Sequence, residues 1–141
     1  MREYPKRLEA AGIDKLRLFE LSYLCKQYRA NKRKIERARA GIVDKRRESS
    51  GAWHLPDPTG NAAINIAAMP EARRVRMIEQ AAAEVAPPSI AEAIITSACD
   101  GVPYERMRHR PPCGRNQFYT MRMDFFIRLD GMLWESEQRR D

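Results

Sequence analysis

A chain of 141 residues with 43% hydrophobic and 32% charged residues is long enough for one globular domain, or for two small halves that share a core, and too short for a two-domain enzyme. Its 26 lysines and arginines outnumber 19 acidic residues, and the net charge of +7 favours a polyanionic partner, with nucleic acid first among them. No apolar run reaches the roughly 20 residues that cross a bilayer, and no apolar stretch follows the first residues, so we expect neither a membrane protein nor a secretory signal. Three widely spaced cysteines fit reduced thiols used for packing, as in a cytoplasmic protein.

The first predicted element is a long helix over residues 14–48, because this stretch contains no proline and one glycine. Its apolar residues recur at steps of three and four, which predicts a packing seam of coiled-coil type. Leu16, Leu18 and Phe19 are expected to widen the seam near its start. Asn31 interrupts the seam: it either fixes the register of a homodimer or lies on a frayed stretch. The seam comprises Leu21, Leu24, Tyr28, Asn31, Ile35, Ala38 and Ile42.

A loop over residues 49–58 and a second helix over residues 59–85 complete the predicted N-terminal domain, residues 1–86. The loop contains turn formers and two prolines, and Trp53 within it is expected to cap the helix pair rather than contact a partner. Pro70 must either kink the second helix or divide it. Two helices joined by such a loop are expected to fold back as an antiparallel hairpin.

The predicted C-terminal domain, residues 87–141, consists of shorter helices. Paired prolines end the preceding helix, and Ser89 followed by Glu92 predicts a capping box for a helix that reaches about Cys99. A short helix over residues 103–108, a stiff turn over residues 111–114 and a final helix over residues 115–135 follow. The sequence therefore predicts an all-α protein: a long antiparallel helical hairpin followed by a C-terminal helix-turn-helix unit.

The final helix has two faces of different chemistry. One face is an apolar stripe that should pack into the core, from Phe118 to Leu133. The other face opens with residue types that contact base edges from a helix lying in the major groove, and we expect base contacts from Arg115, Asn116, Tyr119 and Thr120. Phosphate contacts are expected from Arg106, Arg108, Arg110 and Arg122. The alternative interpretation is the ordinary charged, solvated face of an amphipathic helix.

A second concentration of positive charge lies in the first predicted helix. Residues 26–47 contain ten lysines and arginines but only two acidic residues, Glu36 and Asp44. Because like charges at this density repel one another unless an anion relieves them, we expect Lys32, Lys34 and Arg37 to lie along a DNA backbone. The alternative is a solvated face whose long side chains cover apolar surface with their stems.

The segment Cys113-Gly-Arg-Asn-Gln-Phe-Tyr-Thr-Met-Arg-Met-Asp-Phe-Phe126, entered from Gly101-Val-Pro-Tyr104, resembles the C-terminal helix-turn-helix of small phage-encoded late-gene regulators of the ArpU and RinA type. Those proteins are similar in turn to region four of sigma factors. The family's recognition helix opens with a small polar stretch, followed by an aromatic pair and basic residues. Here these are matched by Arg115, Asn116, Gln117, Phe118, Tyr119 and Arg122. The resemblance implies activation of transcription of phage or prophage packaging or morphogenesis genes in the bacterial cytoplasm. Double-stranded DNA is the expected partner, and whether the protein also contacts RNA polymerase directly is left open by the sequence.

Two other functions fit the same sequence. A small terminase subunit also joins a helix-turn-helix to an oligomerising hairpin, and a non-catalytic helical interaction module would bind an acidic protein with its basic helix. An enzyme is not expected, because the chain has no Gly-rich phosphate loop, no His-Glu-x-x-His and no serine elbow motif. No cofactor and no metal are predicted, since the histidines and cysteines do not follow zinc-site spacing.

Overall fold

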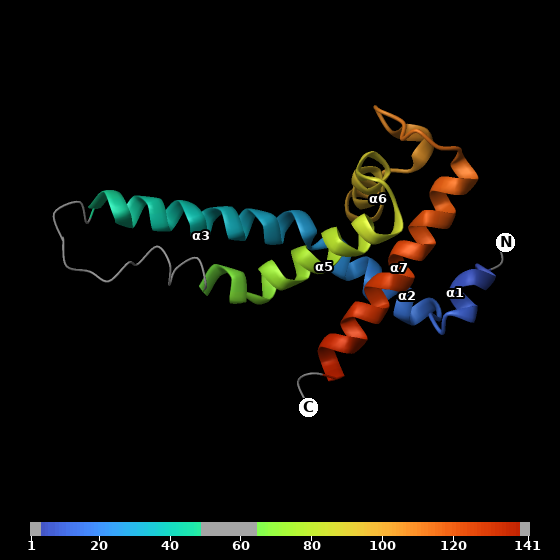
Figure 1. The fold of residues 1–141 in the computed structure, drawn as a ribbon, viewed down its shortest axis with the longest axis horizontal. Helices are drawn as coiled ribbons and strands as arrows, with labels where there is room; N and C mark the ends of the chain where they lie inside the picture. Colours follow the sequence, from blue (N-terminus) through green and yellow to red (C-terminus); the bar gives the residue numbers. More distant parts are fainter. Residues whose placement is uncertain (1–3, 49–64, 139–141) are drawn as a thin grey trace. The chain divides into compact units, whose positions relative to one another are not determined.

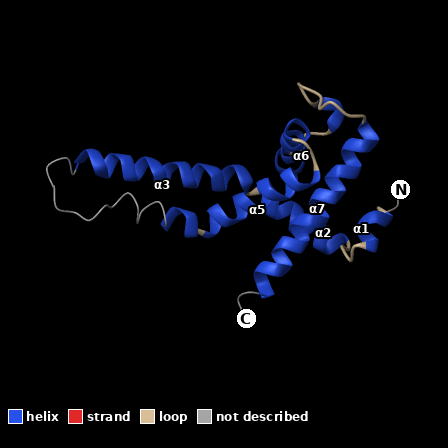
Figure 2. Cartoon of the chain, in the orientation of Figure 1, coloured by secondary structure: helices blue, strands red, loops and turns tan. Residues whose placement is uncertain are grey.

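The computed structural model of the chain describes residues 4–48 and 65–138, and from residue 42 to residue 48 it describes the backbone alone. All regular elements in these ranges are helices and none is a strand, which confirms the predicted all-α class (Figure 2). Within them, no helix combines the length and the apolar character that a membrane crossing requires. The predicted loop over residues 49–58, with Trp53, and the predicted start of the second helix at residue 59 lie outside the described residues.

The chain divides into two compact units that do not follow the expected division after residue 86. The first unit combines Met1–Gln27 with Met77–Asp141, and the second is Tyr28–Arg76. The N-terminal residues join the C-terminal ones because Leu8, Ile13 and Leu21 are buried, and the helices that contain Leu8 and Leu21 pack against the C-terminal helices. Burial of apolar side chains thus decides the division, and separation along the sequence does not.

The first unit contains α1 (Lys6–Ala10), α2 (Lys15–Lys26), the end of α5 (Pro70–Val85), α6 (Pro88–Asp100), a 3₁₀ turn η1 (Tyr104–Arg106) and α7 (Arg115–Gln138) (Figure 1). Helix α2 packs on α6 and α7, and these two pack on each other. The predicted apolar stripe of α7 supplies the centre of this core, because Phe118, Phe125 and Leu129 are fully buried. Ile94 of α6 and Leu21 of α2 are buried with them.

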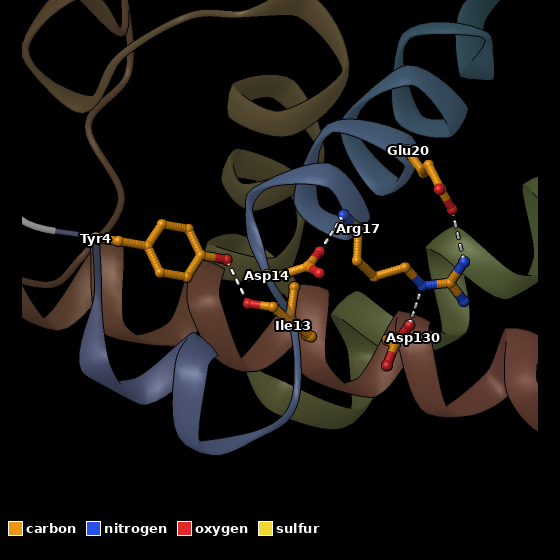
Figure 3. A network of polar contacts seen from close by, with 6 residues as sticks. All are labelled: Tyr4, Ile13, Asp14, Arg17, Glu20 and Asp130. Carbon is orange, nitrogen blue, oxygen red and sulfur yellow. Dashed lines mark hydrogen bonds and ion pairs between the residues drawn. The ribbon is translucent and has the colours of Figure 1, made fainter.

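The N-terminal segment includes a short helix, α1, that the sequence did not predict. Gly12 follows it with a φ of 80°, a left-handed conformation that glycine adopts at little cost, and the chain turns there into α2. The predicted helix start at residue 14 is confirmed, because the Asp14 carboxylate accepts a hydrogen bond of 2.8 Å from the Arg17 amide. The Arg17 guanidinium donates to Asp130 of α7 and to Glu20, which fastens α2 to the core (Figure 3).

The predicted single helix over residues 14–48 is wrong in one respect, because the chain forms two helices, α2 and α3 (Tyr28–Glu48). They meet at Gln27, whose amide donates to the carbonyl of Leu24 in a tight turn of 3₁₀ type, and such turns commonly end an α-helix. The predicted seam holds in part, since Leu21, Tyr28, Asn31 and Ile35 are buried. The side chain of Ile42 is outside the described residues.

The sequence left open whether Pro70 kinks or divides the second helix, and the structure shows division: residues 65–68 are helical, the chain bends at Met69, and α5 begins at Pro70, where the missing amide does no harm. Two further sequence predictions need correction. The capping box does not form, since α6 begins at Pro88 after Pro87 and no side chain caps it. The helix expected over residues 103–108 is the single turn η1, because a short segment between prolines gains too few hydrogen bonds to nucleate an α-helix.

Candidate nucleic-acid interface

The segment between α6 and α7, residues 101–114, is here called the connecting loop, and Tyr104 anchors it. The Tyr104 amide donates to the Tyr119 hydroxyl at 3.2 Å, and the Tyr104 hydroxyl donates to the carbonyl of Cys113 at 2.8 Å. The Tyr104 ring also packs against buried Phe118, with ring centroids 5.5 Å apart. Because Phe118 and Tyr119 belong to the first turns of α7, these contacts hold the loop in a fixed relation to the start of that helix.

Between α6 and the connecting loop lies an open hollow of about 590 Å³, here called the arginine hollow. Three of the predicted phosphate-binding residues, Arg106, Arg108 and Arg110, line it together with His109. All four side chains are exposed. The Arg110 guanidinium lies 5.8 Å from the centre of the Tyr104 ring, a cation–π contact that holds one of the charges in place.

The charge of the arginine hollow is weakly compensated. In the described part of the chain no ion pair engages Arg106, Arg108 or Arg110, and Glu92 is the one carboxylate among the lining residues. Three guanidinium groups that repel one another across a concave, open surface attract polyanions, and guanidinium forks match phosphate oxygens well. Ser89, also in the lining, adds a hydroxyl group that can donate to phosphate, whereas the Thr96 hydroxyl donates to the carbonyl of Glu92 at 3.1 Å.

A second hollow, of about 420 Å³, opens on the start of α7 and is here called the recognition hollow. All four predicted base-reading residues line it, joined by Met123. They meet because positions 115, 116, 119 and 120 are three to four residues apart and share one face of a helix. The opposite face is held in the core by Phe118 and Phe125, so the polar face points outward. The four base-reading candidates that line this hollow are Arg115, Asn116, Tyr119 and Thr120.

Glu105, to which the sequence prediction assigned no role, lies at the edge of this site. Its carboxylate pairs with the Arg115 guanidinium and accepts a hydrogen bond of 3.3 Å from the Tyr119 hydroxyl. The hydrogen bond from Arg115 lowers the pKa of Glu105, so the carboxylate stays ionised at neutral pH. Two of the four residues of the recognition hollow are thus engaged by one acidic side chain. No spacing rule relates residues 105 and 115 across an irregular loop, which is why the pair was missed.

Arg122 does not lie where the sequence placed it. Its side chain is half-buried, its guanidinium lies 5.4 Å from the centre of the Phe126 ring, and its Nε has no hydrogen-bond partner among the described residues. Burial lowers the pKa of Arg122, since a charge removed from water is less stable. The prediction assigned this position to the polar face, although it is four residues before Phe126 and therefore turns toward the core. Arg122 lines neither the arginine hollow nor the hollow at the start of α7.

The basic residues predicted on the first helix belong to the second unit. Lys32 lies over the Tyr28 ring, with its Nζ 5.4 Å from the ring centroid. The Nζ of Lys34 lies 3.9 Å from a carboxylate oxygen of Glu71, and Arg37 is exposed. These three cations lie at successive positions along α3 rather than around a hollow.

Comparisons of the chain with protein-family models, with curated proteins and with solved structures gave no match. In the described ranges no group of three or more histidine, cysteine or acidic side chains is arranged to hold a metal ion. The three cysteines are free thiols, with Cys25 and Cys99 buried and Cys113 half-buried. The two hollows are therefore the candidate sites on the described part of the chain.

Proposed function

We propose that the protein is a sequence-specific double-stranded-DNA-binding regulator of phage or prophage late genes. The observation that supports this most is the convergence of the predicted contact residues on one part of the first unit. Three arginines that form no ion pair with a described residue line the arginine hollow, and the four base-reading candidates line the recognition hollow. Tyr104 joins the connecting loop to the start of α7, so the two sets of residues have a common support.

Each set has its own task in the proposed complex. Arg106, Arg108 and Arg110 neutralise phosphates and set the orientation of the protein on the duplex. The first turns of α7 then enter the major groove, where Asn116 can form two hydrogen bonds with an adenine and Arg115 two with a guanine. Arg115 must exchange its contact with Glu105 for the base or phosphate, so the bound state competes with an existing ion pair.

The resemblance to late-gene regulators of the ArpU and RinA type supports the regulatory part of the proposal. The motif from Cys113 to Phe126 that resembles the family includes all four residues of the predicted base-reading set. In that setting RNA polymerase is a further partner. The alternative of a DNA-packaging subunit shares the DNA contacts and differs in assembly, with a ring of many subunits expected.

The test is fluorescence anisotropy of a labelled random duplex titrated with the protein at several salt concentrations. Wild-type protein should bind, and the logarithm of its affinity should fall linearly with the logarithm of salt. The double variant Arg108→Ala/Arg110→Ala should lose about tenfold or more at low salt, and its slope should become shallower by about two because two phosphate contacts disappear.

A matched control lowers the net charge by the same two units elsewhere in the first unit, through reversal of the exposed Lys6 as Lys6→Glu. Its net charge equals that of the arginine variant, so any general effect of charge on the affinity is the same in both. An equal loss in the two variants would show that the arginine hollow is not a contact site. Absence of binding by wild-type protein even at low salt would overturn the proposal and leave the protein-interaction module.

A further inference from the structure

Helix α2 exposes three large apolar side chains, although the sequence analysis expected two of them in the core. Leu16 is 76% exposed, Phe19 is 69% exposed and Tyr23 is 60% exposed. Leu21 and Cys25, on the opposite face of the same helix, are buried at 1% and 0%. A soluble helix usually exposes polar side chains on its outer face, so a line of three apolar ones marks a contact surface.

The three side chains are spaced as in a coiled coil. Steps of three and four residues, from 16 to 19 and from 19 to 23, place them at successive a, d and a positions of a heptad repeat. Lys15 then occupies the g position before Phe19, and Glu20 occupies the e position after it. Both flanking charges are exposed. This surface is called the α2 stripe: Leu16, Phe19 and Tyr23 with the flanking Lys15 and Glu20.

The flanking charges of Lys15 and Glu20 favour a second copy of α2 as the occupant, in the parallel orientation. In a parallel pair of helices a g residue faces the e residue that lies five positions further along the partner helix. Lys15 would face Glu20 of a second copy, and by symmetry the same pair forms twice. An antiparallel pair would place e against e, so Glu20 would face Glu20 of the second copy and repel it. Glu20 uses its Oε2 atom to pair with Arg17, and its other carboxylate oxygen stays open to such a contact.

We propose that the α2 stripe binds the α2 stripe of a second copy of this chain as a parallel, two-fold symmetric helix pair. The complex is weak. Three side chains expose a few hundred Å², against roughly 800 Å² per partner in an interface of standard size. The dimer should therefore form at micromolar concentrations or above, and Lys26, at the next d position, ends the seam. This inference does not depend on DNA binding.

The experiment is sedimentation equilibrium of the full chain over a range from micromolar to millimolar concentration. Wild-type protein should show a reversible monomer–dimer equilibrium, and Phe19→Glu should raise the dissociation constant at least tenfold. Because Phe19 is exposed, this variant should fold as the wild type does, which circular dichroism checks. Exposed Gln138 at the end of α7 gives the matched control for an added negative charge, and Gln138→Glu should leave the dimer unchanged.

The direction of the pair is tested by charge exchange. Lys15→Glu and Glu20→Lys should each weaken the homodimer roughly fivefold, because each places like charges opposite each other. An equimolar mixture of the two single variants should form heterodimers, since every facing pair then has opposite signs. Monomers at all concentrations, or a dimer that Phe19→Glu does not weaken, would overturn the proposal. A dimer in which the mixture shows no preference for heterodimers would overturn the parallel arrangement.

Discussion

Two regions of the molecule are rich in positive charge: the connecting loop together with the start of α7, and the basic helix α3. They differ in how their charged side chains are arranged. Around the arginine hollow, three guanidinium groups converge on one concave surface, and α7 presents polar side chains that can hydrogen-bond to bases beside it. On α3 the cations follow one another along a helix, and Lys34 lies near Glu71. In the proposed complex the first arrangement would distinguish sequences, whereas the second would add only salt-dependent affinity.

The difference shows that the number of charges is a poor guide to a binding site. Residues 26–47 contain more lysines and arginines than the connecting loop does. What the loop has in addition is a rigid support: the Tyr104 ring on Phe118, and the Tyr104 hydroxyl bonded to the Cys113 carbonyl. Contacts that specify a sequence require this kind of support, because a misplaced donor loses its partner.

The largest expected effect comes from removing the support itself. Phe118 is fully buried, so Phe118→Ala should lower the free energy of unfolding by about 3–5 kcal/mol, through lost burial and the cavity left behind. Urea denaturation of the whole chain measures this change. Exposed Gln117, the neighbouring residue on α7, supplies the control, since Gln117→Ala should change stability little. A loss under 1 kcal/mol for Phe118→Ala would mean that the loop is not supported from this position.

The next effect separates the two regions by specificity. Asn116→Ala should reduce the preference for a selected duplex over a random one by about 1–3 kcal/mol, because a base contact is lost. Arg37→Ala on α3 should weaken both duplexes equally and make the salt slope shallower by about one. Selection of bound duplexes from a random pool, followed by anisotropy with the selected and random sequences, measures both. Equal losses on both duplexes for Asn116→Ala would remove Asn116 from the base-reading set.

The smallest expected effect concerns Glu105. Glu105→Gln frees Arg115 and removes a negative charge beside the recognition hollow, so DNA affinity should rise a few-fold at low salt, in line with an exposed ion pair. The pKa of Glu105 is lowered by Arg115, so the pair stays intact at neutral pH and is lost only as pH falls through that lowered pKa. Exposed Glu137 near the end of α7 provides the control, and Glu137→Gln should leave affinity nearly unchanged. Unchanged affinity in Glu105→Gln would show that the pair does not compete with DNA.

Helical periodicity predicted the elements with the most regular apolar pattern and missed features set by the tertiary structure. The apolar stripe of α7 and the helix start at residue 14 depend on local sequence, and both were predicted. The helix break at Gln27 is not marked by a proline or a glycine in the sequence. The burial of Arg122 depends on which face of α7 packs into the core. Leu16 and Phe19 are apolar, as core residues usually are, and both are exposed. Their spacing does not reveal which side of α2 packs on α6 and α7.

The four residues of the recognition hollow could be predicted because they lie on one helix, where sequence spacing fixes the face. The arginine hollow is different, since its lining comes from both α6 and the connecting loop, and the sequence predicted its arginines without the hollow that they share. Glu105 reaches Arg115 across an irregular segment, and only coordinates can bring such a pair together.

The most direct test of the proposed interface is an NMR titration of isotope-labelled protein with a short duplex at low salt. Docking on the connecting loop and the start of α7 predicts that the largest amide shifts fall between residues 104 and 120, with the Arg115 and Asn116 signals among them. Shifts confined to α3, or spread evenly over every exposed lysine and arginine, would contradict the assignment of DNA recognition to this face.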